Sequence, residues 1–187
     1  MADLAAGKNL RRLADATRLH QAGRLDEAEA LYAAILRDAP DDPVALINGG
    51  SLAMTRNDVA TALARLGHAV RIAPGNAVAY NNLGFAHLHA QQPRDALAAL
   101  DEAVRLSPDY AQAHNNRGIA LTQLKRGDEA AAAFERALSL DQGTLDHERE
   151  VIADYGNMSA PTVLFVLERA MERGLPARSR SAQNTIR

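Results

Sequence analysis

Apolar residues recur along this chain at helical spacing, in short segments separated by turn-forming residues. Residues 77–89, for example, carry apolar side chains at Tyr80, Leu83, Phe85 and Leu88, and Pro93 opens the next such segment. The pattern predicts an all-α region with no strand between residues 9 and 140. The eight expected helices span residues 9–22, 25–38, 43–56, 59–72, 77–90, 93–106, 111–124 and 127–140.

These segments repeat with a period of 34 residues, which groups the eight helices into four pairs. Only seven of the 187 residues are proline, so three prolines on one period are strong support for a repeat. The units expected from this period are residues 9–42, 43–76, 77–110 and 111–142. The residues that share the register are Pro40, Pro74 and Pro108, then Gly50, Gly84 and Gly118, and then Ala28, Ala62, Ala96 and Ala130.

The units resemble the tetratricopeptide repeat, and the third unit resembles it most closely. The first unit deviates most, as terminal repeats commonly do. The resemblance implies a right-handed superhelical α-solenoid of four TPR helix pairs that serves protein–protein interaction. The residues of the third unit that match the repeat are Tyr80, Leu83, Gly84, Ala96, Leu100, Ala103 and Pro108.

Small residues are expected where the two helices of a unit approach each other. We expect Gly84 on the first helix to face Ala96 on the second, and Gly118 to face Ala130 in the next unit. A larger side chain at such a contact would overpack it, at about 1–3 kcal/mol.

The resemblance also implies that the first helix of each unit lines a concave groove, through positions 2, 5, 6, 9, 12 and 13. Position 6 is Asn in the last three units (Asn48, Asn82, Asn116), and position 5 adds Asn81 and Asn115. Because an Asn amide both donates and accepts hydrogen bonds, such a column could bind the backbone of an extended peptide. It resembles the asparagine ladder of the tetratricopeptide superhelix in O-GlcNAc transferase. The alternative is that Asn-Asn is only a common solvated choice in this repeat.

Charge and composition exclude several other functions. The chain has 21 Lys and Arg against 23 Asp and Glu, so it lacks the basic excess with which proteins neutralise nucleic-acid phosphates. Its longest strongly apolar stretch, Val163 to Leu167, is far shorter than the roughly 20 residues that span a bilayer. The N-terminus shows no secretory apolar segment. We therefore expect a cytoplasmic chain that binds neither nucleic acid nor membrane.

The candidate chemistry for catalysis or metal binding is sparse. The absence of Cys excludes disulfides, a thiolate nucleophile and Cys-ligated zinc. His87 and His89 are two residues apart and point to different helix faces, and we expect His87 and His114 to be packed structural residues. No phosphate-binding glycine loop or nucleophile elbow is present. We predict no metal, no cofactor and no enzymatic activity.

The sequence after the repeats has a different character. Residues 154–167, DYGNMSAPTVLFVL, resemble the C-terminal region of type III polyketide synthases, the chalcone and stilbene synthase family. The resemblance implies that Asn157 matches the family's catalytic Asn, which acts together with a Cys and a His. This chain has no Cys and no His in the matching setting, so Asn157 lacks its partners. We predict a synthase-like helical appendage over residues 143–175, which caps the last repeat, and a flexible tail over residues 176–187.

Together these features favour a non-catalytic scaffold or adaptor that binds a protein or an extended peptide. The alternative is a fragment or accessory of a type III polyketide synthase, of the acyltransferase class and inactive alone. A third option is self-association of the solenoid through an apolar terminal face.

Overall fold

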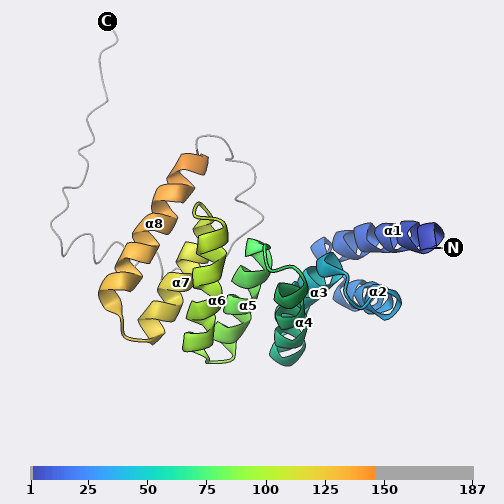
Figure 1. The fold of residues 1–187 in the computed structure, drawn as a ribbon, viewed down its shortest axis with the longest axis horizontal. Coiled ribbons are helices and arrows are strands. Elements are labelled where there is room, and N and C mark those ends of the chain that lie inside the picture. The colour runs from blue at the N-terminus through green and yellow to red at the C-terminus, as the bar shows by residue number, and fades with distance from the viewer. Residues whose placement is uncertain (1, 146–187) are drawn as a thin grey trace, which may run out of the picture. The chain divides into compact units, whose positions relative to one another are not determined.

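The structure, a computed structural model, describes residues 2–145, with side chains from residue 7 to residue 140. The chain divides into two compact units, residues 1–140 and residues 141–187. The described residues form helices and turns without a strand (Figure 1). The helices are α1 (Ala2–Gln21), α2 (Leu25–Asp38), α3 (Pro43–Thr55), α4 (Val59–Ile72), α5 (Ala77–His89), α6 (Pro93–Leu106), α7 (Ala111–Gln123) and α8 (Gly127–Leu145).

The predicted helices are confirmed, and the boundaries of α2 to α7 agree with the expected ones to within one residue. Two outer boundaries differ. Helix α1 begins at Ala2 instead of residue 9, and α8 ends at Leu145 instead of residue 140. Before residue 9 the chain reads ADLAAGK, mostly good helix formers with no proline, so nothing in this stretch stops the helix at the repeat boundary.

Side chains of the linkers fix where several helices begin. Asp42 accepts a hydrogen bond from the amide of Ala45 (2.8 Å), and Asn76 accepts one from the amide of Ala79 (3.0 Å). Each bond satisfies an amide that has no partner within its helix, which contributes about 1 kcal/mol. Pro43 occupies the first turn of α3, where its missing N–H costs nothing.

The turn between the two helices of each unit has the same backbone conformation every time. The residue at position 15 is left-handed, with φ between 57° and 73°. In the first unit the amide of Arg24 donates back to the carbonyl of Leu19 (2.9 Å), as in a Schellman motif. Glycine is free to adopt this conformation, whereas other residues are strained in it. The four residues are Gly23, Asn57, Gln91 and Lys125.

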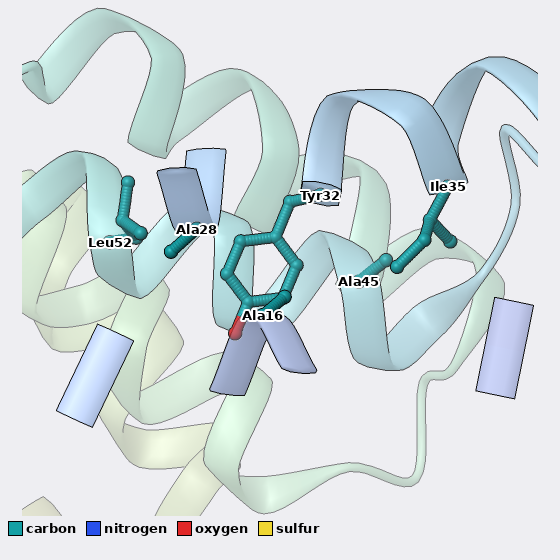
Figure 2. Packing of buried hydrophobic residues seen from close by; sticks show 6 residues of the cluster. All are labelled: Ala16, Ala28, Tyr32, Ile35, Ala45 and Leu52. Carbon is teal, nitrogen blue, oxygen red and sulfur yellow. The ribbon is translucent and has the colours of Figure 1, made fainter. Parts of the chain in front are cut away.

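The core runs along the stack as a series of small clusters, each joining three consecutive helices. The second helix of a unit packs on its own first helix and on the first helix of the next unit, as α2 does on α1 and α3. Figure 2 shows one cluster, built around the fully buried Tyr32 of α2. Stability is therefore the sum of unit and nearest-neighbour terms, as in other repeat proteins. The cluster consists of Ala16, Ala28, Tyr32, Ile35, Ala45 and Leu52.

The glycines at position 8 of the first helices are required by close contact, and their nearest neighbour is the residue at position 24, in addition to the expected Ala96 in the case of Gly84. A Cβ on Gly84 would lie 2.5 Å from Cγ of Leu100, whereas the nearest atom of Ala96 is its carbonyl oxygen at 3.2 Å. The glycine at position 8 thus makes room above all for the large residue at position 24. At Gly118 the same Cβ would lie 2.5 Å from the ring of Phe134.

First helices of successive units lie against one another: α1 contacts α3, α3 contacts α5, and α5 contacts α7. The second helices α2, α4 and α6 instead pack mainly on first helices. The first helices therefore form a continuous row along the repeat region.

Candidate functional site

The five candidate Asn residues lie on three first helices, but their side chains differ in accessibility. Asn48 in α3 and Asn82 in α5 are partly exposed. Asn81, Asn115 and Asn116 are buried, with exposed fractions of 1%, 7% and 5%. The structure therefore leaves Asn48 and Asn82 partly exposed, although Asn48 also hydrogen-bonds with the side chain of Tyr32, and encloses the other three.

The buried amides form a hydrogen-bond network between the third and fourth units. Asn116 donates from its amide nitrogen to Oδ1 of Asn81 (2.9 Å), and Asn81 donates to the hydroxyl of Tyr110 (3.3 Å) and to Oδ1 of Asn82 (3.3 Å). Burial raises the pKa of Tyr110, and its hydroxyl donates a hydrogen bond to Gln112 (3.3 Å). Asn81 consequently holds the accessible Asn82 in place through a direct bond.

Asn115 occupies the same repeat position as Asn81, one unit later, yet its environment differs. Among the described residues its Oδ1 is buried and has no hydrogen-bond partner. One partner of Asn81, Asn116, is supplied by the following unit, whereas Tyr110 is the last residue of its own unit. Asn115 lies in the last of the four units, so the described residues include no fifth unit to play that part.

Although α1 also exposes Arg11, Asp15 and Arg18, one face of the first helices is formed in every unit by positions 2, 6, 9 and 13. These positions are four, three and four residues apart, which places them on one face of a helix. We call this surface the first-helix face. Of its sixteen residues only Asn116 is buried. They are Leu10, Ala14, Thr17 and Gln21 in α1; Val44, Asn48, Ser51 and Thr55 in α3; Val78, Asn82, Phe85 and His89 in α5; and Gln112, Asn116, Ile119 and Gln123 in α7.

The sequence reasoning missed the apolar column of this face, at position 2. Leu10, Val44 and Val78 are exposed by 73%, 46% and 47%. The only other large apolar side chain that is similarly exposed in the described residues is Ile72, on a second helix. The available signal was the 34-residue spacing of three aliphatic residues, each four positions before position 6 of its unit.

Charged side chains lie elsewhere, and several of them form ion pairs that link helices. Arg65 of α4 binds Glu29 of α2 and the carbonyl oxygen of Gly49 (3.0 Å), and Arg12 pairs with Asp38. The Arg12 hydrogen bond lowers the pKa of Asp38. These pairs stabilise the contacts between helices and leave the first-helix face uncharged.

Two histidines act as local structural residues. His114 is buried and its Nε2 lies 2.9 Å from the carbonyl oxygen of Pro108, while His87 is partly exposed and pairs through Nδ1 with Gln92 (2.8 Å). Within residues 2–145 no group of three or more His, Cys, Asp or Glu side chains could hold a metal ion. In the same residues no helix combines the length and the apolar character needed to cross a membrane.

The sequence of the last two units matches a known family model. Residues 81–144 match the model described as tetratricopeptide repeat. The fold is that of the tetratricopeptide repeat. A crystal structure of MamA protein shares it with a TM-score of 0.68 and 21% identity, over 95% of this chain and 98% of that one. MamA from Desulfovibrio magneticus RS-1, residues 41 to the end, has a TM-score of 0.66 and 23% identity, over 72% and 76%.

Two further tetratricopeptide structures are similar to parts of the chain. The O-GlcNAc transferase of Thermobaculum terrenum has 29% identity and a TM-score of 0.60, covering 63% of this chain but 22% of that one. The first TPR of Spaghetti (RPAP3), bound to the HSP90 peptide SRMEEVD, has 23% identity and a TM-score of 0.62, covering 64% and 94%. Among curated proteins no relative matches this chain.

The predictions for the C-terminal part concern residues outside the described ones. The synthase-like appendage over 143–175 lies there apart from the end of α8, as do Asn157 and the predicted tail over 176–187. The family match to the tetratricopeptide repeat ends at residue 144. No comparison supports the resemblance to type III polyketide synthases, which stays a prediction.

Proposed function

We propose that residues 9–142 form a non-catalytic scaffold that binds an extended segment of another protein along the first-helix face. The observation that carries this proposal is the repetition of Asn48 and Asn82, equivalent and accessible side chains on neighbouring first helices that contact each other. A row of equivalent groups at a regular interval suits a ligand that itself repeats at a regular interval, as a peptide backbone does.

The chemistry of the amide supports this reading. Each Asn side chain can donate two hydrogen bonds and accept two, so it can bind the N–H or the C=O of a backbone without reading side chains. Packed helices lie roughly 8–10 Å apart and an extended chain rises about 3.3 Å per residue, so neighbouring Asn residues would engage about every third residue. Asn81 and Asn116 serve as positioning residues behind this row.

The comparisons support the general class of function. A protein with the same fold is described as bound to an HSP90 peptide, so this architecture can hold a peptide ligand. The alternative function, a fragment or accessory of a type III polyketide synthase, depends on residues outside the described part. No observation favours it.

The proposal is tested by affinity capture with the purified full chain as bait and mass spectrometry as readout. Replacing both Asn48 and Asn82 with Ala should reduce recovery of the captured protein about tenfold, because each hydrogen bond contributes about 0.5–1.5 kcal/mol. The matched control is Arg94→Ala, an exposed position on the second helix α6, which should leave recovery unchanged. Equal recovery with the double variant and the wild type would refute the proposed role of this face.

A further inference from the structure

The first-helix face has a composition that narrows the chemistry of its ligand. About 24% of all residues in the chain are charged, so about four of the sixteen residues on this face would be charged if it followed the whole chain. None of them is Asp, Glu, Lys or Arg, and the helices α3 and α5 contain no such residue at all. An accessible helix face is normally where a protein places its charges, so this face departs from the ordinary solvent-facing pattern.

The same face carries the exposed aliphatic column Leu10, Val44 and Val78. Three of the four large apolar side chains exposed in the described residues stand at this one repeat position. Scattered exposed apolar residues are normal on a protein surface, whereas residues gathered in register mark an interaction site. Val44 and Asn48 are four residues apart, as are Val78 and Asn82, so each valine lies one helical turn from an accessible amide on the same face.

We infer that the ligand of this face is an uncharged extended segment with aliphatic residues at every third position, an inference that rests on the proposed function. Charge complementarity carries it: a charged ligand would lose hydration on this face and gain no opposite charge in return. An uncharged segment loses no ionic hydration, buries aliphatic side chains against Leu10, Val44 and Val78, and satisfies its backbone through Asn48 and Asn82.

Geometry sets the interval between the aliphatic residues. A segment in the polyproline II conformation has three residues per turn and rises about 3.1 Å per residue, so residues three apart face the same way at roughly 9 Å. This distance matches the roughly 8–10 Å between packed helices. Three aliphatic residues at i, i+3 and i+6 can therefore meet Leu10, Val44 and Val78 in turn.

The inferred ligand of this chain differs in charge from the peptide bound to a protein with the same fold. The HSP90 peptide SRMEEVD bound to the Spaghetti repeat contains three acidic residues and one Arg. This chain offers no cation on the first-helix face to pair with such acids. A tetratricopeptide fold shared at 23% identity thus carries a different ligand preference.

The test is a selection from a phage-displayed library of random dodecapeptides, with the purified full chain as bait. Retained peptides should be depleted in Asp, Glu, Lys and Arg relative to the input, and enriched in Val, Leu or Ile at a spacing of three. Fluorescence polarisation with one retained peptide should then show binding weakened at least tenfold by the double variant Val44→Ser, Val78→Ser. Ile72→Ser is the matched control, because it removes an exposed aliphatic residue outside the face, and it should bind as the wild type does.

The other outcomes of this selection show whether the inference fails alone or together with the proposed function. Retained peptides rich in charge, whose binding depends on Asn48 and Asn82, would overturn the inference and leave the proposed function standing. No retained peptide at all would overturn both. A concentration-dependent dimer in sedimentation, lost in the valine double variant and without any retained peptide, would also overturn the inference, because a second copy would then occupy the face.

Discussion

Gly84 is the position where a single added carbon should be felt most clearly. In Gly84→Ala the new Cβ would lie 2.5 Å from Cγ and 2.9 Å from Cδ2 of Leu100, and 3.2 Å from the carbonyl oxygen of Ala96. Because Leu100 is fully buried, its side chain can move only by displacing other core residues. The contact must therefore be relieved by separating α5 from α6 or by forcing Leu100 out of its rotamer.

The magnitude follows from two opposing terms. Overpacking a core contact costs about 1–3 kcal/mol, whereas replacing Gly by Ala inside a helix stabilises by about 0.5–1 kcal/mol. The overpacking term should win, lowering the free energy of unfolding by about 1–2 kcal/mol. For a chain of this size that corresponds to a decrease in Tm of about 2–8 °C. Gly67 is the matched control, since only Arg71 lies near its added Cβ, at 3.9 Å; Gly67→Ala should raise the Tm.

Thermal melts followed by circular dichroism of both variants, together with Leu100→Ala and Gly84→Ala/Leu100→Ala, test this account. In the Leu100→Ala background the penalty of Gly84→Ala should disappear, giving a coupling energy of about 1–3 kcal/mol. If Gly84→Ala is as stabilising as Gly67→Ala, or if its penalty persists without the Leu100 side chain, the close contact does not limit this position.

Three further predictions concern the turns and the buried polar groups. Asn81→Leu should lower the free energy of unfolding by about 1–3 kcal/mol in chemical denaturation, because it leaves buried polar partners unpaired. Asn115→Leu removes an unpaired oxygen and should leave the free energy of unfolding unchanged or raise it. A larger loss of stability in Asn115→Leu than in Asn81→Leu would refute the hydrogen-bond network. Lys125→Gly should raise the Tm and Gly23→Ala should lower it, because both residues have positive φ. A Tm that changes in the same direction in both variants would contradict the left-handed turns. Hydrogen bonds from the side chain and then the backbone of Thr61 lower the pKa of Asp58. The ionised Asp58 therefore stabilises the fold above its unfolded pKa of about 3.9, and this stabilisation is lost as the pH falls through the lower folded pKa. Asp58→Asn should reduce the drop in Tm between pH 5 and pH 3, and an unchanged drop would show that Asp58 does not cause it.

The architecture could be predicted from the sequence because the 34-residue period and the position of each breaker are local signals. Pro43 and Pro93 marked the helix starts, and the spacing of Gly84 and Ala96 revealed two helices in close contact. The identity of that contact could not be predicted, because whether Gly84 faces position 20 or position 24 depends on how far one helix is shifted along the other. This shift is a property of packing, which no single segment encodes.

The candidate site was predictable in part. The Asn column was visible as a repeated residue type, but burial distinguishes Asn48 from Asn116 even though both occupy position 6. That difference arises from the preceding unit: Asn81 of the third unit bonds to Asn116, whereas the residue that stands in the same position relative to Asn48 is Leu13 of the first unit. Val44 and Val78 were overlooked because an aliphatic residue in an amphipathic helix is ordinarily assigned to the core, and only the coordinates show that these two are exposed.

Photo-crosslinking tests the central claim, that the first helices carry the binding surface, most directly. A peptide retained in the library selection would be synthesised with a diazirine analogue of leucine at one aliphatic position, bound to the full chain, irradiated, and mapped by mass spectrometry. The account predicts cross-links to α1, α3 and α5, concentrated near Leu10, Val44 and Val78. Cross-links that fall instead on the second helices α2, α4 and α6 would contradict it.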